Sequence, residues 1–452
     1  MKNNIKKSKE AITLISLILT IVLLIILSII SIRIITNDDT VSNAEKVSKD
    51  YLEAETINKI QLAYKDLQSE QLINLNFDDT QFLKNKLNYY GIEDAAVTTD
   101  DSQYIVVINE TTYILSKGTG LAQKEKQISE YPEIQPNVTA TENSRYISDN
   151  KTAIIPAGYT VSEIELEQSI DNGLVVKDSS ANEWVWIPVN DADFAKLFAE
   201  AADDGWTMSG TSVKTKYKSN SDIIEGISRT NPGNSSDDSY REPDIVEVAD
   251  DPSYFETMGF NKIKTISELA RVLKIDYEKM MNSIRKYKGF YIGRYEISDS
   301  GVKKNQYPCT NETWYSYYNK CKQLGKESTE ARMIWGCQWD QTCKFISQYK
   351  EGNQIKTRDL TNSTSYGNYA GSTESGHGII QTTGFSEVWK TNNIYDLAGN
   401  SFEWTQEANY SNSRAIRGGG ASGINNSVLE RSADIAPGSN PSYSTRPMLY
   451  IK

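Results

Sequence analysis

An almost wholly apolar run, from Ile12 to Ile32, dominates the start of the chain. In a helix, about 20 apolar residues span the roughly 30 Å hydrocarbon core of a bilayer. The pattern therefore predicts a transmembrane helix over residues 12–35, preceded by a basic leader at residues 1–11. The lysines of the leader favour a cytoplasmic N-terminus and an extracellular C-terminal domain. The sequence thus predicts a single-pass protein of the cell membrane, with the lipid bilayer as a partner.

Residues 36–120 change to a mixed pattern. Apolar and aromatic residues recur at roughly helical spacing from Val41 to Leu67, and charged residues fill the gaps, which predicts a long amphipathic helix. Two β-prone runs follow at residues 104–108 and 111–115, and the short turn between them predicts a hairpin in a small sheet. A stalk or a coiled coil would give the same helical pattern.

Beyond this region the chain predicts a linker and one large domain. Residues 121–150 are polar and irregular, which is typical of a linker. The large domain then covers residues 151–452. Within it, charged residues alternate with apolar ones from Ile266 to Lys286, which predicts an amphipathic helix. The expected fold class is α+β.

Composition and charge narrow the functions that are open to the chain. The formal net charge is −12, and an acidic protein is repelled by phosphate backbones, so no nucleic-acid partner is expected. A single histidine, His377, excludes any centre that needs several histidines in one chain. The four cysteines are not spaced as zinc ligands. Their disulfide state stays open, and free buried thiols are the simpler interpretation for Cys309, Cys321, Cys337 and Cys343.

The segment Lys9-Glu-Ala-Ile-Thr-Leu-Ile-Ser resembles the leader of type IV prepilins. In that family the leader is removed just before the apolar helix and the new N-terminus is methylated. The resemblance implies cleavage between Ala11 and Ile12, with a prepilin peptidase and other pilin subunits as partners. The family usually has glycine where Ala11 stands and glutamate where Ser16 stands, but leaders without that glutamate occur in pilin-like proteins of Gram-positive bacteria. An uncleaved signal anchor is the alternative.

Five short motifs stand in order along the large domain. They are Trp184-Val-Trp-Ile-Pro-Val, Gly289-Phe-Tyr-Ile-Gly-Arg-Tyr-Glu, Arg332-Met-Ile-Trp-Gly-Cys-Gln-Trp-Asp, Tyr395-Asp-Leu-Ala-Gly-Asn-Ser-Phe-Glu-Trp and Arg446-Pro-Met-Leu-Tyr-Ile. With the Arg-Gly-Gly-Gly turn at Arg417, they resemble the formylglycine-generating (sulfatase-modifying factor) family, whose domain is a variant of the C-type lectin fold. The resemblance implies that the first two motifs are strands, that the third precedes a helix, and that the last closes the sheet.

The motif at Tyr395 offers oxygen ligands to a metal ion. Asp396 and Glu403 flank a turn, and such a loop can wrap a hard cation with carboxylates and backbone carbonyls. The resemblance implies a structural Ca²⁺ held by Asp396, the carbonyl groups of Gly399 and Ser401, and Glu403. The alternative is a structural turn in which Glu403 pairs with an arginine.

Oxygenases of this family bind copper through cysteines that follow the Arg-Gly-Gly turn. Residues 417–452 contain no cysteine, and the single histidine does not allow the iron-binding histidine cluster of other relatives. We therefore expect no catalytic residues and neither copper nor iron. An oxidoreductase of the formylglycine-generating family is the alternative.

The C-terminal stretch is rich in Asn, Ser and Tyr, which make adaptable contacts. In binding proteins with the C-type lectin fold, this region forms the exposed ligand face. The predicted ligand-face residues are Asn409, Tyr410, Asn412, Asn425, Asn426 and Tyr443. The sequence thus predicts a pilin-like surface protein, in a filament or as a lone anchor, that displays a non-catalytic domain for adhesion to an extracellular protein or glycan. A purely structural minor pilin is the alternative.

Overall fold

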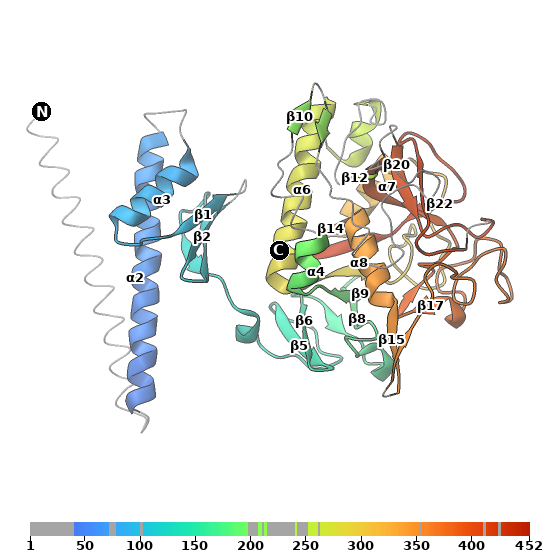
Figure 1. The fold of residues 1–452 in the computed structure, drawn as a ribbon, viewed down its shortest axis with the longest axis horizontal. Helices are drawn as coiled ribbons and strands as arrows, with labels where there is room; N and C mark the ends of the chain where they lie inside the picture. The colour runs from blue at the N-terminus through green and yellow to red at the C-terminus, as the bar shows by residue number, and fades with distance from the viewer. Residues whose placement is uncertain are drawn as a thin grey trace, which may run out of the picture. The chain divides into compact units, whose positions relative to one another are not determined.

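The computed structural model describes residues 40–71, 78–99, 103–197, 207–209, 212–214, 240–241, 252–260, 263–352, 354–409, 413–423 and 426–452 (Figure 1). The chain divides into two compact units, Met1–Lys126 and Gln127–Lys452. Both units combine helices with mainly antiparallel sheets, so the fold class is α+β, as predicted.

The first unit packs a long helix and a short one against a small sheet. Its elements are α2 (Thr40–Gln71), α3 (Asp79–Tyr89), β1 (Ala96–Thr99), β2 (Gln103–Ile108), β3 (Thr111–Ser116) and β4 (Ala122–Lys124), and the sheet order is β1-β2-β3-β4. The predicted helix and hairpin are both present. Asn109 and Glu110 have φ angles of 47° and 65°, which suits the tight turn between β2 and β3. Ile60, Leu67 and Leu115 are fully buried in the core of this unit.

The second unit is organised around two sheets. The first has the order β14-β23-β13-β9-β8-β7, with bounds Thr329–Met333, Pro447–Ile451, Gly289–Gly293, Glu183–Pro188, Val175–Lys177 and Thr160–Val161. The second has the order β12-β19-β20-β21, with bounds Tyr240–Arg241, Phe402–Asn409, Ser413–Arg417 and Arg431–Asp434, and β22 (Tyr443–Thr445) pairs with β19 in parallel. The strands expected at Trp184, Gly289 and Arg446 are therefore found in one sheet.

Helices and short hairpins complete the second unit. The helices are α4 (Asp191–Leu197), α6 (Ile266–Tyr287), α7 (Trp314–Lys322) and α8 (Gly336–Ile346), with 3₁₀ turns η1 (Ile128–Glu130), η2 (Glu165–Glu167), η3 (Pro252–Met258) and η4 (Glu387–Trp389). The hairpins are β5–β6 (Ser144–Ser148, Lys151–Ile155), β10–β11 (Thr207–Ser209, Ser212–Lys214), β15–β16 (Gln348–Glu351, Gln354–Thr357) and β17–β18 (Lys390–Thr391, Ile394–Tyr395). The predicted helix over 266–286 is α6, whose start is capped by Thr265 and Glu268.

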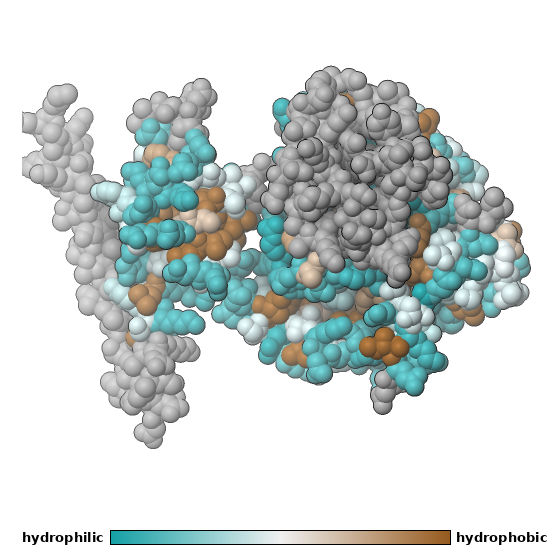
Figure 2. Space-filling view, viewed as in Figure 1, coloured by the Kyte–Doolittle hydropathy of each residue, from teal (hydrophilic) through white to brown (hydrophobic). Residues whose placement is uncertain are grey.

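Strand β9 explains why the first sheet is buried on both faces. Side chains alternate between the two faces of a strand. Trp184 and Trp186 enter one apolar core, whereas Val185 and Ile187 enter the other. All four are fully buried, so β9 lies at the centre of the unit. Hydrophilic residues cover most of the described surface in the view of Figure 2.

Residues 121–150 differ from the predicted linker. The structure places β4 in the sheet of the first unit and β5 in a hairpin of the second, and the units divide between Lys126 and Gln127. These strands are short and polar, and they form because β3 and β6 supply pairing partners.

The prediction of a single-pass membrane protein requires correction. The leader at residues 1–11, the helix over residues 12–35 and the cleavage site at Ala11 and Ile12 lie outside the described residues. Among the helices that are described, none is both long and apolar enough to cross a membrane. α2 has 32 residues, but charged side chains recur along it.

Candidate functional site

The turn at residues 396–401, between β18 and β19, contains three residues with a left-handed backbone conformation. The φ angles are 57° at Asp396, 79° at Gly399 and 61° at Asn400. A Cβ atom on Gly399 would lie 2.1 Å from the carbonyl oxygen of Asn368, so only glycine fits there. This tight turn brings Asp396 back toward Glu403.

Four buried charged side chains meet beside this turn, and we call them the acid-rich centre: Glu296, Asp396, Glu403 and Arg446. Each is at most 1% exposed. Nε of Arg446 donates to Oε1 and Oε2 of Glu403 at 3.1 and 3.0 Å, and Nη2 donates to Oε1 at 2.6 Å. This bidentate pair is the strongest type of charged hydrogen bond in proteins.

The other two carboxyl groups of the acid-rich centre accept hydrogen bonds that fix the turn to its surroundings. Glu296 accepts hydrogen bonds from the Ser401 backbone N–H at 3.0 Å and from Nδ2 of Asn400 at 2.6 Å. Oδ2 of Asp396 accepts one from the Gly384 backbone N–H at 2.7 Å. Glu296 therefore holds the end of the turn, and Asp396 ties its start to Gly384.

Three carboxyl groups share one guanidinium in this centre. Burial raises the pKa of Asp396 to about 6, and it raises that of Glu403 to about 7 although Arg446 opposes the shift. Burial, reinforced by the charges of Asp396 and Glu403, raises the pKa of Glu296 well above its usual range. The acid-rich centre therefore retains a proton near neutral pH.

Glu403, one of the calcium ligands that the resemblance implies, is already paired in this geometry. Both carboxylate oxygens of Glu403 are taken by Arg446, which is the arginine-paired turn given above as the alternative. Oδ1 of Asp396 and Oγ of Ser401 are buried without a hydrogen-bond partner. In the part of the chain that the structure describes, Asp396 and Glu403 belong to no group of three His, Cys, Asp or Glu residues whose ligand atoms lie within 4.8 Å of one another.

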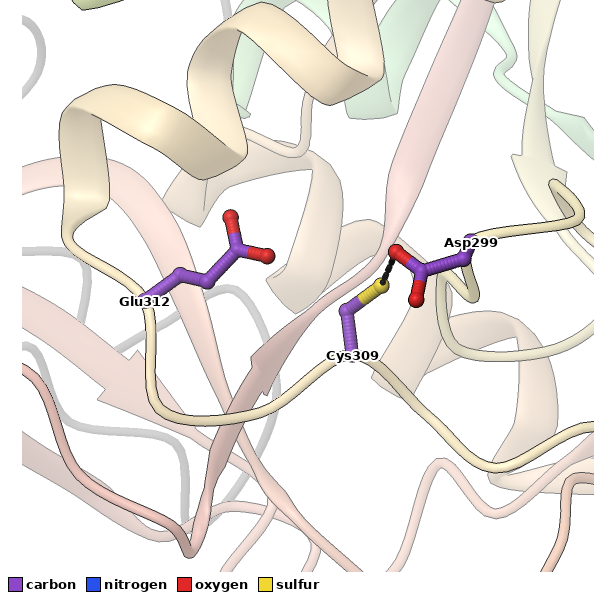
Figure 3. A group of neighbouring side chains, drawn as sticks. All are labelled: Asp299, Cys309 and Glu312. Carbon is purple, nitrogen blue, oxygen red and sulfur yellow. Dashed lines mark hydrogen bonds between the residues drawn. The ribbon is translucent and has the colours of Figure 1, made fainter.

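One such group does occur, at Asp299, Cys309 and Glu312 (Figure 3). Sγ of Cys309 lies 3.1 Å from Oδ1 of Asp299. Nζ of Lys320 lies 2.9 Å from the same Asp299 oxygen and 3.1 Å from Oε1 of Glu312. An ammonium group thus already bridges the two carboxylates, and we interpret the group as an ion-pair cluster.

A second set of buried charges lies farther along β19, and we call it the balanced centre: Asp340, Glu407, Arg417 and Arg431. Nη2 of Arg417 donates to Oδ1 of Asp340 at 2.9 Å, and Nη2 of Arg431 lies 3.2 Å from both Asp340 oxygens. Nε of Arg431 donates to Oε2 of Glu407 at 3.1 Å. Although burial opposes its charge, Asp340 and Glu407 raise the pKa of Arg417. These bonds tie β19, β20 and β21 to α8.

Residues 358–386 run between β16 and η4 with no helix or strand longer than an isolated bridge, and the structure describes all of them. Buried side chains hold this long segment in place. The hydroxyl of Tyr369 donates to the carbonyl oxygen of Gly418 at 2.7 Å, and the Ser363 N–H donates to that of Asn426 at 2.6 Å. Tyr369 and Ser363 are fully buried, so the segment is anchored to the interior of the unit.

Several exposed side chains of this segment are polar, although Ile379 and Phe385 are exposed as well. We call the polar set the polar loop face, which consists of the exposed Thr361, Asn362, Ser365, Thr373, Ser375 and His377 with the half-buried Asn426. Hydroxyl, amide and imidazole groups can both donate and accept hydrogen bonds. The face is therefore suited to a polar ligand.

The structure brings one predicted ligand-face residue to the polar loop face. Tyr410, Asn412 and Asn425 lie outside the described residues, and Asn409 ends β19 with only its backbone described. Asn426 lies on the face, and its Oδ1 is buried without a partner. Tyr443 is half-buried and packs edge-on against Trp404, with ring centroids 5.4 Å apart. Its ring therefore supports the core of the unit.

The four cysteines are free and buried. Burial raises the pKa of the Cys309 and Cys343 thiols to about 12 and that of Cys321 well above its usual range. Because the thiolate is the nucleophilic and metal-binding form, these thiols are poorly suited to catalysis. His377 is exposed, with Nδ1 3.2 Å from the carbonyl oxygen of Tyr369.

Comparisons with known proteins identify no family for this chain. No family model matches it, and no curated protein does. Among solved structures, Treponema denticola variable protein 1 matches with a TM-score of 0.28 and 14% sequence identity. That match covers 36% of this chain and 85% of the other. A likeness of this strength supports no conclusion about fold or function.

Proposed function

We propose that the protein is a non-catalytic ligand-binding protein, and that its large unit is a C-type lectin-like domain of the formylglycine-generating type. The order of the five motifs supports this assignment. The first, second and fifth motifs contribute β9, β13 and β23 to one sheet, and the third motif leads into α8. The buried, protonated thiols favour binding over an oxidoreductase activity.

One observation carries the binding function: residues 358–386 are ordered although they form no helix or strand beyond the isolated bridge. Ordered loops longer than about 12–15 residues are uncommon, and many of them are functional. Fixing the backbone of each residue costs roughly 1–2 kcal/mol of conformational entropy. The buried anchors Tyr369 and Ser363 offset part of that cost before a ligand arrives, which favours tight recognition.

The chemistry of the polar loop face indicates the class of ligand. Its exposed groups are hydroxyls, an amide and an imidazole, which pair with hydroxyl-rich or amide-rich partners. A glycan or a polar protein surface fits this description, and these are the partners that we propose.

A binding screen with the labelled full chain against immobilised glycans and cell-surface proteins tests this proposal. Ser365→Trp places a bulky ring on the polar loop face, and Ser179→Trp is the matched control at another exposed serine. We expect Ser365→Trp to weaken binding at least about tenfold, equivalent to about 1.4 kcal/mol, while the control binds normally. Equal losses in both variants would contradict a binding role for this face.

We also propose that the first unit is a pilin-like assembly module. The observation in favour is the packing of the long helix α2 on an antiparallel sheet, with Tyr51 and Leu52 left 46% and 59% exposed. Sedimentation of the full chain tests this function. Self-association that disappears in Leu52→Asp would support it, and a monomer at all concentrations would argue against it.

A further inference from the structure

We propose that the guanidinium of Arg446 is a built-in cation that occupies an all-oxygen cage, so that residues 396–403 keep their conformation without calcium. Arg446 lies between β22 and β23, and its side chain is fully buried. It therefore reaches the turn from the junction between a strand of the second sheet and a strand of the first.

Four oxygen atoms from three elements surround the guanidinium. Nη1 donates to the carbonyl oxygen of Gly293 at the end of β13 at 3.0 Å, and Nη2 donates to that of Tyr395 in β18 at 2.9 Å. Oε1 and Oε2 of Glu403, in β19, complete the cage at 2.6 to 3.1 Å. The three elements are thus fastened through one positive group.

These ligands are of the kind that calcium prefers. Ca²⁺ binds carboxylate and carbonyl oxygens at about 2.3–2.6 Å. A guanidinium is larger, and it satisfies the same oxygens through directed N–H bonds at hydrogen-bond distances. A metal ion at Glu403 would face a buried like charge, and displacing Arg446 would leave that charge unpaired, which is strongly unfavourable. The cage can therefore hold the arginine or a metal ion, but not both.

The planar fork of arginine explains why this residue serves as the cation. It offers donors in several fixed directions, whereas lysine offers one compact charge. Arg446 uses Nε, Nη1 and Nη2 at once, toward Glu403, Gly293 and Tyr395. Since the cation is part of the chain, the turn is independent of the concentration of any free ion.

The first experiment measures the melting temperature of the full wild-type chain in EDTA and in 5 mM CaCl₂. We expect a difference below about 2 °C, because a ligand raises stability only if it binds the folded state. A larger rise that disappears in Asp396→Asn would overturn the proposal. A rise that survives in Asp396→Asn would come from another site and would agree with the arginine-filled cage.

The second experiment empties the cage. Arg446→Met removes the guanidinium, and Arg332→Met is the matched control, since Arg332 is also buried and is paired bidentately with Asp276. We expect 5 mM CaCl₂ to raise the melting temperature of Arg446→Met by several degrees more than that of Arg332→Met. An equal response of the two variants would contradict the cage. If Arg446→Met does not fold, the wild-type measurement still decides the proposal.

Discussion

Two buried ionic centres share strand β19, and they differ in how their charges balance. The acid-rich centre sets the carboxyl groups of Glu296, Asp396 and Glu403 against Arg446 alone, whereas the balanced centre has two carboxylates and two guanidinium groups. Taking a charge out of water is costly unless it is paired. The balanced centre meets that cost with ion pairs, but the acid-rich centre also needs protons. Only the acid-rich centre should therefore change its contribution to stability with pH near neutrality.

Removing one arginine from each centre should separate them most clearly. Breaking a buried ion pair costs about 3–5 kcal/mol. We expect Arg417→Met to fall in this range, because Arg431 still pairs with Asp340 and Glu407. Arg446→Met should cost more, since no arginine of the centre then remains to pair with its three carboxyl groups. Urea unfolding at pH 7 measures both free energies of unfolding. A smaller cost for Arg446→Met would show that proton uptake compensates fully for the lost charge.

The two centres meet where the Gly399 N–H donates to the carbonyl oxygen of Gly418 at 2.9 Å. A methyl group on Gly399 would clash with the backbone of Asn368 and force alanine into a left-handed conformation. We expect Gly399→Ala to cost about 3–4 kcal/mol. Gly158 has a similar φ of 84° but open space around its Cβ position, so Gly158→Ala should cost only about 1–2 kcal/mol. Equal costs in urea unfolding would mean that the turn can move away from Asn368.

Some of these elements follow from local sequence patterns. The amphipathic period over 266–286 predicts α6, and the β-prone runs at 104–108 and 111–115 predict β2 and β3, because each pattern is complete within its own segment. Strand β4 has three residues and no pattern of its own, and it forms only because β3 pairs with it. Short strands of this kind depend on partners that a local reading does not supply.

The candidate site was less predictable, because its contacts join distant parts of the chain. Glu296 and Arg446 both stand in the quoted motifs, yet the motifs indicate no role for either. Arg446 is 43 residues from Glu403, and Glu296 is 104 residues from Asn400. The pairing of Glu403 with an arginine is only the alternative interpretation of its motif. Tyr369 and Ser363 carry no signal beyond a polar, aromatic stretch, and their anchoring role depends entirely on the fold.

The dependence of stability on pH should distinguish the two centres next. Asp396 has an ordinary pKa of 3.8, and burial raises it to about 6 in the folded protein. The folded state then binds this proton more tightly, so its stabilisation is complete below pH 3.8 and is lost as the pH rises through about 6. We expect the wild type to lose about 3 kcal/mol relative to Asp396→Asn between pH 3.8 and pH 7.

Urea unfolding of both proteins across this pH range measures the difference. Asp299→Asn is a control in which the pH dependence of stability should have the opposite sign. Hydrogen bonds from Lys320 and Cys309 lower the pKa of Asp299. Its carboxylate stabilises the fold above the ordinary pKa, and that small contribution is lost as the pH falls. A constant difference between the wild type and Asp396→Asn would show that Asp396 stays ionised, and the acid-rich centre would then resemble the balanced one.

The smallest expected change in stability concerns residues 358–386, which carry the polar loop face. Tyr369 of this segment bonds Gly418, the neighbour of Arg417 in the balanced centre. Tyr369→Phe removes the hydrogen bond to the Gly418 carbonyl oxygen and leaves the ring in place. We expect a loss of about 1 kcal/mol in urea unfolding. Ligand binding should weaken as well, since the segment would no longer be held in its bound conformation. Tyr307→Phe is the matched control, because Tyr307 is 74% exposed. If Tyr369→Phe lowers stability but binds the ligand as the wild type does, the hydrogen bond from Tyr369 to Gly418 is not what positions the polar loop face.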